Sequence, residues 1–322
     1  MSFLLLLGQY FLLGFSTLVF WRYFLRVYCC RRAGSRRIAE RGDAILVTGC
    51  DRGFGRLIAV KMHSLGATVY AGCLSQDSCT ELNRECNQST EARMVAFRLD
   101  VTKSADVASA VELVKKGGKR LAAVVNNAGI SAFGWAEALD VTIYERIMNV
   151  NFLGTVRITK AFLPLLREHR GRLVNMGSIG ARMPSSFGSA YLSSKAAMCS
   201  YSDCVRQELH RFGVHVALVE PGFFSTGLLE SGAEDGQKLS NDPEGYPEYG
   251  EKMKRTAETI RQLERLNGLD CKWVIDAVKD AVVSRYPLAR YTVGWDARLI
   301  RHVLAPFLPA WFIDKVQTAQ DN

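Results

Sequence analysis

The hydrophobic pattern alternates between two periods from residue 43 onward. Six short runs of β-branched and other apolar residues lie at 44–48, 67–72, 93–99, 121–126, 172–176 and 214–220. Longer amphipathic stretches separate them, at 54–66, 104–116, 139–169 and 189–212. Strands that alternate with helices form a parallel sheet covered on both faces, and such strands are almost uniformly apolar. The pattern predicts an α/β fold, a doubly wound parallel sheet of the Rossmann type in a single domain.

The alternation loosens after Pro221. Residues 230–252 are polar and rich in turn formers, and they show no apolar periodicity. We interpret them as part of a substrate-lid insertion over about 223–266 rather than as a second domain. Helical stretches are predicted at about 253–266 and 273–284, and a last strand at 289–294. The apolar tail 302–316 fits either a segment packed on the core or a contact with a membrane surface.

The first 21 residues contain no charged side chain. A helix of ~20 residues, rising ~1.5 Å per residue, crosses the ~30 Å hydrocarbon layer of a bilayer. Seven arginines follow between residues 22 and 41, with Glu40 as the one acid there. We therefore predict a transmembrane anchor at 1–21, a basic juxtamembrane linker at 22–42 and the folded domain at 43–322.

The charge asymmetry also predicts a location. The positive-inside rule places everything after Arg22 in the cytosol, and we expect the protein at the endoplasmic reticulum membrane. A mitochondrial presequence is an alternative, because residues 22–39 are arginine-rich and free of acid; it would place the protein at a mitochondrial membrane. A cleaved signal peptide fits less well, since no basic residue precedes the apolar run.

Composition narrows the classes of function. The formal charge is +9, but most of the excess lies in the linker, beside an apolar segment, which indicates a membrane surface rather than nucleic acid. The nine cysteines form no C-x-x-C pair, and the histidines form no H-E-x-x-H motif. We expect no metal and a reducing compartment. The sequence leaves the oligomeric state open, with a homodimer as one option.

A glycine-rich stretch, TGCDRGFG at 48–55, follows the first predicted strand and opens the first predicted helix. Its G-x-x-x-G-x-G spacing differs from the common dinucleotide fingerprint, so a plain turn is an alternative. Glycines let the backbone approach a pyrophosphate, and a helix N-terminus offers free N–H groups with a partial positive charge. The flanking strand and helix favour a phosphate cradle.

Tyr191 and Lys195 form a second candidate for chemistry. Their spacing of four places both on one face of the predicted helix 189–212. An ammonium ion beside a phenol lowers the pKa of the phenol from ~10 toward the range of a proton-transfer catalyst. Such pairs are common on helix surfaces, but here Ser178 adds a hydroxyl just after the predicted strand 172–176.

These polar clusters share one position in the predicted fold. The glycine loop, NNAG at 126–129, Ser178 and PGFFST at 221–226 all follow the carboxyl ends of predicted strands. Ligands of doubly wound sheets bind outside those ends. We therefore expect all four clusters to face one crevice.

At these motifs the sequence resembles the short-chain dehydrogenases/reductases. The matching stretches are TGCDRGFG (48–55), LDVT (99–102), NNAG (126–129), NVNFLG (149–154), Ser178 with YLSSK (191–195), and PGFFST (221–226). They keep the family's order and spacing over about residues 43–230. The residues in these stretches are most similar to those of the branch that holds retinol, hydroxysteroid and 3-hydroxybutyrate dehydrogenases.

The resemblance implies a role for each matching residue. Tyr191 is implied to be the general acid/base, with Lys195 lowering its pKa and binding the nicotinamide ribose. Ser178 would polarise the substrate oxygen, and Asn151 would support a water relay to Lys195. The implied cofactor contacts are Gly49, Asp51, Arg52, Gly53, Phe54, Gly55, Asp100, Asn127, Ala128, Gly129, Tyr191, Lys195, Pro221, Gly222 and Thr226. Among them the glycines of the loop would take the pyrophosphate, Asp100 the adenine and Pro221 to Thr226 the nicotinamide.

The choice between NAD and NADP is balanced. Cys73 and Leu74 stand where an acid at the end of the second strand would bind the ribose of NAD, and Arg52 suits the extra phosphate of NADP. Asp51 would repel that phosphate, and relatives with an acid there tend to use NAD. The sequence leans weakly to NAD.

We expect an NAD(P)-dependent oxidoreductase that interconverts an alcohol and a carbonyl on a lipophilic steroid or retinoid. Aromatic residues near the motifs would supply apolar walls: Phe133, Trp135, Phe187, Phe223 and Phe224. The first alternative is a short hydroxy acid such as 3-hydroxybutyrate, whose carboxylate Arg182 would bind. A membrane-tethered scaffold without turnover is an alternative from a different class.

Overall fold

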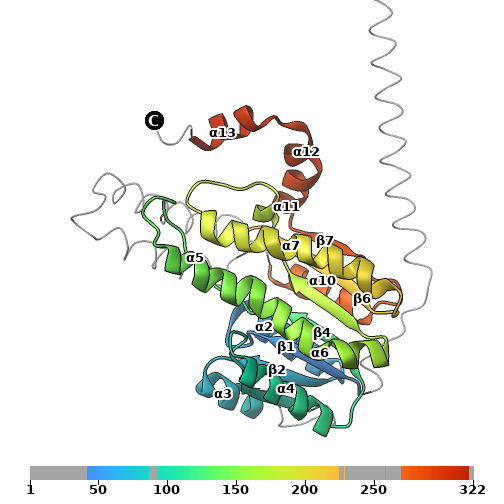
Figure 1. Ribbon diagram of the computed structural model, residues 1–322. Coiled ribbons are helices and arrows are strands. Elements are labelled where there is room, and N and C mark those ends of the chain that lie inside the picture. Colours follow the sequence, from blue (N-terminus) through green and yellow to red (C-terminus); the bar gives the residue numbers. More distant parts are fainter. Residues whose placement is uncertain (1–41, 87–92, 225–227, 229–257, 259–269, 319–322) are drawn as a thin grey trace, which may run out of the picture.

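Seven parallel strands form one sheet at the centre of the described structure (Figure 1). A computed structural model describes residues 42–86, 93–224, 228, 258 and 270–318. The strands are β1 (Ala44–Thr48), β2 (Thr68–Cys73), β3 (Met94–Arg98), β4 (Leu121–Asn126), β5 (Arg172–Met176), β6 (His215–Pro221) and β7 (Arg290–Val293). They lie in the order β3-β2-β1-β4-β5-β6-β7, and every neighbouring pair is parallel. The order reverses between β1 and β4, which is where such sheets bind ligands.

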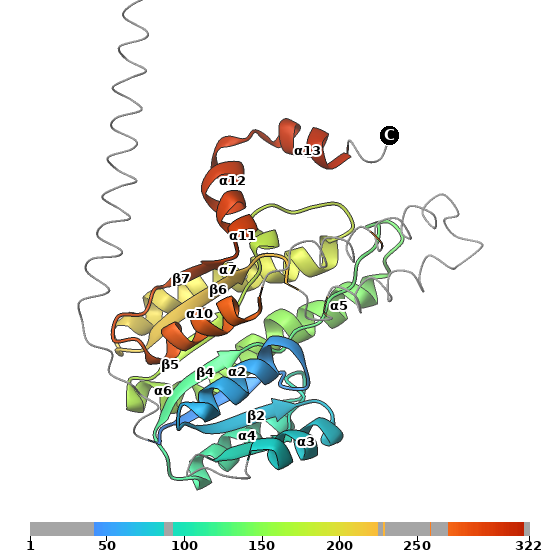
Figure 2. The ribbon, with the colours of Figure 1, turned by 180° about the vertical axis from the view of Figure 1, so that it is seen from behind.

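Three helices cover each face of the sheet. One face carries α4 (Ser104–Lys116), α6 (Thr155–His169) and α7 (Ser189–His210), which lie in front in Figure 1. The other face carries α2 (Gly53–Ser64), α3 (Gln76–Cys86) and α10 (Lys272–Val283), seen from behind in Figure 2. This layering buries the strands on both sides.

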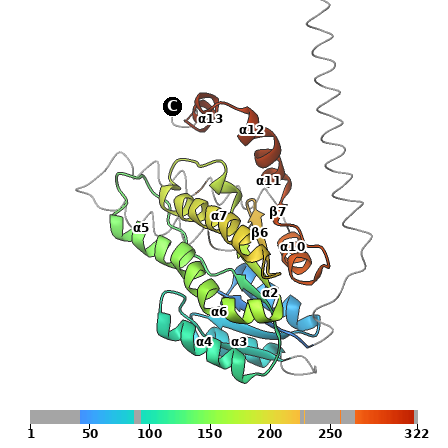
Figure 3. The same ribbon diagram turned by 45° about the vertical axis from the view of Figure 1, so that its right-hand side comes forward.

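The remaining helices lie at the carboxyl edge of the sheet or continue a covering helix. Two of them lead into α6: α5 (Val141–Met148) and the π-helical turn η2 (Asn149–Gly154). A short 3-10 turn, η3 (Ile179–Ala181), follows β5. The C-terminal segment consists of α11 (Trp295–Leu299), the π-helical turn η4 (Ile300–Leu304), α12 (Ala305–Phe307) and α13 (Ala310–Thr318), and it extends away from the sheet (Figure 3).

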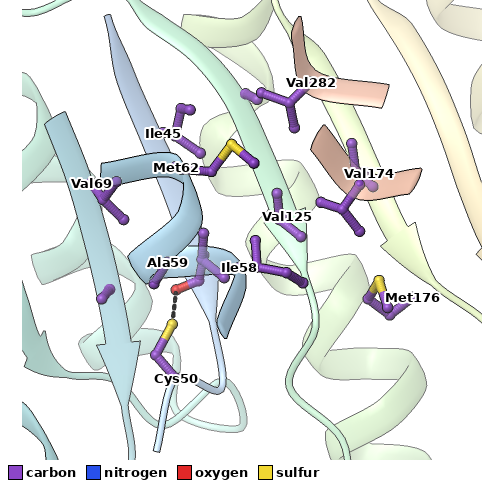
Figure 4. Close-up of a cluster of buried hydrophobic side chains, with 14 of the residues drawn as sticks. Ile45, Cys50, Ile58, Ala59, Met62, Val69, Val125, Val174, Met176 and Val282 are labelled. Atoms are coloured by element: carbon purple, nitrogen blue, oxygen red, sulfur yellow. Dashed lines mark hydrogen bonds between the residues drawn. The ribbon is translucent and has the colours of Figure 1, made fainter. Parts of the chain in front are cut away.

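Alternating side chains of β1 feed two separate cores. Ile45 points to the face of α2 and α10, where it packs with Ile58, Met62 and Val282 (Figure 4). Val47 belongs to the same cluster. Ala44 and Leu46 point to the opposite face and pack with residues of α4 and α6. All of these strand residues are fully buried. The uniform apolarity of the strand thus reflects burial on both faces, as the pattern predicted.

The hydrophobic pattern located the sheet accurately. Strands β1, β4 and β5 coincide with the predicted runs, and each of the other strands differs by one residue at each end. Helix α3 was missed, because its sequence QDSCTELNREC is mostly polar and buries only Cys79 and Leu82. The predicted helix 139–169 is real but contains the π-helical turn η2, which the apolar period did not reveal.

The C-terminal tail does not pack on the core along its length. Large apolar side chains at a spacing of four are exposed on this segment: Trp295, Leu299, Val303, Phe307 and Trp311. The opposite side of α11 and η4 is anchored, with Ala297 and Ile300 packed on Ile179. Core packing was therefore the wrong interpretation for most of the tail.

Two parts of the chain with predictions lie largely outside the described residues. The first is the N-terminal part, with the predicted anchor at 1–21 and the linker at 22–42. The second is the predicted lid at 223–266, which includes the predicted helix at 253–266. Within the part of the chain that the structure describes, no helix combines the length and apolarity needed to cross a membrane.

Candidate active site

The glycine loop after β1 has a backbone that only glycine fits. Gly49 and Gly53 have positive φ angles of 71° and 60°. A Cβ on Gly49 would lie 2.7 Å from the Cα of Ala128, and one on Gly55 would collide with the carbonyl oxygen of Gly49. Helix α2 begins here, without a side-chain cap at Arg52 and without an acid in its first turn. The residues present therefore fit a phosphate group at the helix N-terminus.

The end of β4 holds this loop in place. The Thr48 hydroxyl accepts hydrogen bonds from the backbone N–H groups of Asn127 and Ala128, at 3.1 and 3.0 Å. The Asn127 side-chain amide donates to the carbonyl oxygens of Thr48 and Gly49, both at 3.0 Å. Asn127 was expected as a wall of the cofactor site; its amide in addition fixes the shape of the loop. Thr48 was missed, although it opens the glycine motif.

Asp51 connects the glycine loop to the end of β2. Its carboxylate accepts the backbone N–H groups of Leu74 and Ser75, at 2.9 and 2.8 Å. These are the first residues beyond Cys73, where β2 ends. Arg52, in contrast, is exposed. Phe54 packs edge-on against Phe224, with ring centroids 5.8 Å apart.

Asp100 lies just beyond β3, near the proposed adenine end. Partial burial raises the pKa of its carboxyl, but hydrogen bonds from the hydroxyl and the backbone N–H of Thr102 outweigh this effect and lower it. These bonds measure 2.6 and 2.9 Å. The carboxylate is therefore ionised and held at a fixed orientation.

Three of the four expected catalytic residues come from two neighbouring elements. Tyr191 and Lys195 lie on the first turns of α7 and are almost fully buried, with 6% and 5% of each exposed. Ser178 is the N-cap of η3, where its hydroxyl oxygen accepts the backbone N–H of Gly180 at 3.2 Å. Ser178 also lies close enough to Tyr191 to lower the pKa of its phenol, and all three residues line one cavity. Their catalytic roles stay a prediction.

Burial controls the acidity of Tyr191. Desolvation raises the pKa of its phenol to about 12, although the hydrogen bond from Ser178 opposes the rise. Lys195 Nζ lies 5.7 Å from the centroid of the phenol ring and donates to the carbonyl oxygen of Met176 at 2.9 Å. Desolvation lowers the pKa of Lys195 to about 8. The expectation of a lowered phenol pKa was thus wrong for the protein by itself, because desolvation is the largest cause of the shift in both groups.

Asn151 lies in the π-helical turn and is completely buried. Its side chain accepts the N–H of Ile130 at 2.8 Å and donates to the carbonyl oxygen of Ile130 and to Ser194 Oγ, both at 2.9 Å. The Thr155 hydroxyl donates to the backbone carbonyl oxygen of Asn151 at 2.9 Å. Asn151 therefore fixes the segment after β4 beside Lys195. Ser194 was not anticipated, although it lies inside YLSSK.

The segment after β6 is held by a residue from the C-terminal segment. Strand β6 ends at Pro221. Two residues later, the backbone N–H of Phe223 donates to Asp296 Oδ2 at 2.7 Å. Asp296 is buried, and any Cβ at Gly222 would collide with its carboxylate. Nothing in the local sequence pointed to Asp296, which lies more than 70 residues away. Thr226 lies outside the described residues.

One cavity of about 970 Å³ joins these features. Every described member of the predicted site lines it except Gly55 and Asn151, which lie behind its wall. Of the five aromatic residues expected as walls, Phe133, Phe223 and Phe224 line it, whereas Trp135 and Phe187 pack on each other with centroids 4.4 Å apart. Further apolar lining comes from Ile130, Ile179, Met183, Leu192, Leu228 and Ile300.

Arg182, the expected partner of a substrate carboxylate, lies elsewhere. Its Nε pairs with the carboxylate of Glu220 at 3.3 Å, and Arg182 is not among the described residues that line the cavity. Arg52 and Arg146 are the arginines that do line it. A carboxylate in the cavity would therefore not meet Arg182 in this arrangement.

Comparison with known proteins agrees with this geometry. The family model described as short chain dehydrogenase matches residues 43–237. The chain is 36% identical to Retinol dehydrogenase 16 of Homo sapiens over 86% of this chain and 88% of that one. It is 38% identical to the mitochondrial D-beta-hydroxybutyrate dehydrogenase of Bos taurus, over 77% and 76%. A solved short-chain dehydrogenase from Streptomyces avermitilis superimposes with a TM-score of 0.68 at 28% identity, covering 88% of this chain and 98% of that one. The chain therefore belongs to the short-chain dehydrogenase family and is an NAD(P)-dependent oxidoreductase that acts on CH–OH groups.

Proposed function

We propose that this enzyme interconverts a lipophilic secondary or allylic alcohol, of the steroid or retinoid class, and its carbonyl compound. The observation that carries the proposal is the meeting of Ser178 and Tyr191 at a large cavity with apolar lining. A bound dinucleotide supplies the hydride acceptor or donor. The residues of this chain supply orientation and the proton.

Tyr191 is the proton-transferring group in this proposal. With a pKa of about 12 its phenol is protonated at neutral pH, so it is ready to protonate a carbonyl oxygen during reduction. During oxidation the group that accepts the alcohol proton is the phenolate of Tyr191, so the phenol must first lose its own proton, and a nearby positive charge favours that ionised form. Lys195, on the same face of α7, supplies that charge below its pKa of about 8.

Ser178 and Asn151 have supporting roles. Ser178 and Tyr191 line the same cavity, and a substrate oxygen held between their hydroxyls would receive two hydrogen bonds. We assign the water relay to the neighbourhood of Asn151, whose side chain fixes Ile130 opposite Lys195. A Cβ on the intervening Gly129 would lie 3.3 Å from Asn151 Oδ1 and 3.6 Å from Lys195 Nζ. Because Gly129 has no side chain, a narrow space stays open between Asn151 and Lys195.

The cofactor would lie along the glycine loop. We propose that Gly49, Gly53 and Gly55 admit the pyrophosphate, Asp100 borders the adenine, and Pro221 and Gly222 border the nicotinamide. We further propose NAD rather than NADP. Asp51 places a carboxylate at the end of β2 and occupies the N–H groups of Leu74 and Ser75, which an additional phosphate would otherwise use. Arg52 is the one feature that favours NADP.

The lipophilic substrate class rests on the lining and on its surroundings. Phe133, Ile179, Met183 and Leu192 form an apolar side beside Tyr191. The C-terminal segment that contributes Ile300 to the cavity also exposes an apolar stripe to the outside. Relatives named for retinol and hydroxysteroids support this class. A membrane anchor at 1–21 with a cytosolic domain would suit substrates dissolved in lipid.

A short hydroxy acid is the second candidate. The relative named D-beta-hydroxybutyrate dehydrogenase favours it, as does Arg146 at the cavity wall. With Arg182 paired to Glu220, a substrate carboxylate would depend on Arg146 or Arg52. This candidate also goes with the mitochondrial location.

A cofactor-reduction screen separates these candidates. The full chain in membranes is supplied with NAD or NADP and with all-trans-retinol, androsterone or 3-hydroxybutyrate, and reduced cofactor is followed by absorbance at ~340 nm. We expect turnover of a lipophilic alcohol with NAD. Preferential turnover of 3-hydroxybutyrate would reject the lipophilic class, and no turnover of any alcohol would reject the proposal.

A further inference from the structure

A buried carboxylate with three arginine partners lies directly behind the active site. Glu220 is fully buried at the end of β6, immediately before Pro221. Its Oε1 accepts from Arg290 at 2.6 Å and from Arg182 at 3.3 Å, and its Oε2 accepts from Arg301 at 2.6 Å. A buried carboxylate is costly unless it is paired and hydrogen-bonded, so these contacts explain why this charge is tolerated here.

The three arginines come from three separate parts of the chain. Arg182 is the C-cap of η3, four residues after Ser178, while Arg290 begins β7 and Arg301 lies in η4. Arg290 also pairs with Asp203 of α7. One carboxylate therefore joins the segment of the catalytic serine, the edge strand and the C-terminal segment.

Two of these arginines stand next to the substrate side of the cavity. Ile300, beside Arg301, lines the cavity, and so does Met183, beside Arg182. The two segments also pack on each other, since Ile179 and Met183 form a cluster with Ala297, Ile300 and Leu304. The ion pairs of Arg182 and Arg301 with Glu220 therefore lie next to the two segments that form this wall.

We propose that Glu220 is a positioning residue that sets the substrate wall of the cavity through Arg301 and the orientation of Ser178 through Arg182. The inference rests on the proposed alcohol chemistry at Tyr191. It explains why a residue with no access to the cavity is charged although the strand residues that precede it, Val216 to Val219, are apolar and buried. It also gives Arg182 a structural role, as a partner of Glu220, in place of binding a substrate carboxylate.

The two ion pairs should affect different kinetic constants. Loosening the wall at Ile300 weakens ground-state and transition-state binding alike, which raises KM. Displacing Ser178 affects the reacting oxygen, which lowers kcat. Mutations that act through such contacts change coupling by roughly 2- to 30-fold. We therefore expect Arg301→Met to raise the substrate KM about tenfold, and Arg182→Met to lower kcat about tenfold, with the KM for the cofactor within twofold.

The first test is kinetic and uses the full chain with the alcohol that the wild type oxidises fastest, androsterone or all-trans-retinol. Arg298→Met is the matched control, because Arg298 is exposed on α11, which runs directly into η4, and lies three residues before Arg301. A folded Arg301→Met enzyme whose substrate KM stays within twofold of wild type would overturn the proposal. So would an equal loss of kcat in Arg301→Met, Arg182→Met and Arg298→Met.

The second test does not depend on turnover. Hydrogen–deuterium exchange of the full chain should show faster exchange at residues 179–183 in Arg301→Met but not in Arg298→Met, because the coupling runs through Glu220. Glu220→Gln should accelerate exchange in both segments, and if it does not fold, the arginine variants still decide. Unchanged exchange at 179–183 in folded Arg301→Met would overturn the coupling. Coupled exchange without turnover of any alcohol would support the coupling and reject the proposed function.

Discussion

The two halves of the active site are built by different means. The cofactor half is held by glycines without room for a Cβ, and by hydrogen bonds that the side chains of Asp51 and Asn127 make with main-chain groups next to β2 and β1. The substrate half is held by side chains distant in sequence, with Asp296 on Phe223 and Arg301 on Glu220. Backbone contacts leave little choice of residue, whereas side-chain walls tolerate exchange. We infer that the first half fixes the cofactor class and the second sets the substrate.

Tyr191 lies where the two halves meet, and its substitution should have the largest effect. Tyr191→Phe keeps the ring against Phe133, with which it packs at 6.0 Å between centroids, and removes the transferable proton. We expect kcat to fall by ~10²-fold or more while cofactor affinity is unchanged, since general acid–base catalysis contributes this much. Steady-state kinetics and cofactor fluorescence titration measure the two quantities. Activity near that of wild type would show that another group transfers the proton.

Substitution of Lys195 measures the free energy that burial of its ammonium group costs the folded state. Its pKa falls from 10.5 in the unfolded chain to about 8 in the fold, so the folded state pays for a buried ammonium below pH 8. That cost is fully present below pH 8 and disappears as the pH rises toward 10.5. Lys195→Met should therefore raise the free energy of unfolding by roughly 2 kcal/mol at pH 7, after the lost hydrogen bond to Met176 is counted.

Urea unfolding at pH 7 and pH 9.5 measures this difference. The advantage of Lys195→Met over wild type should shrink at the higher pH. Lys160→Met, at an exposed position on α6, is the control and should show no such pH dependence. An advantage that grows with pH would contradict the direction of the pKa shift.

Substitution of Asp51 tests whether the cofactor half sets the preference between NAD and NADP. Asp51→Ala removes a negative charge at the end of β2 and frees the N–H groups of Leu74 and Ser75. We expect the ratio of kcat/KM for NADP over NAD to rise by the equivalent of ~1.5–3 kcal/mol, the size of a hydrogen bond to a charged group. Arg52→Ser, at the exposed neighbour, should change the ratio by less than ~1 kcal/mol. A larger effect from Arg52 than from Asp51 would reverse the assignment.

Ile300 should give the smallest effect and one limited to the substrate half. Ile300→Ala shortens a side chain that lines the cavity from the C-terminal segment. Losing part of an apolar contact costs about 1 kcal/mol, so the KM for a bulky alcohol should rise by roughly fivefold. The KM for the cofactor should not change. A rise in the cofactor KM as well would mean that the two halves are not independent.

The sequence by itself determined the sheet and the motifs at its rim. Strands buried on both faces must be apolar, so β1, β4 and β5 could be located to the residue. The glycine loop and YLSSK were readable because each acts within a few residues, through a φ angle or a helical spacing. The family resemblance rested on the same local signals.

Only the tertiary structure decided the rest. The raised pKa of Tyr191 depends on burial, which a spacing of four to Lys195 does not reveal. Arg182, predicted to bind a substrate carboxylate, is paired with Glu220, 38 residues away. Asp296 and Arg301 reach the site from a tail with no motif. Desolvation and long-range pairing depend on how distant segments meet, so the chain order alone could not predict them.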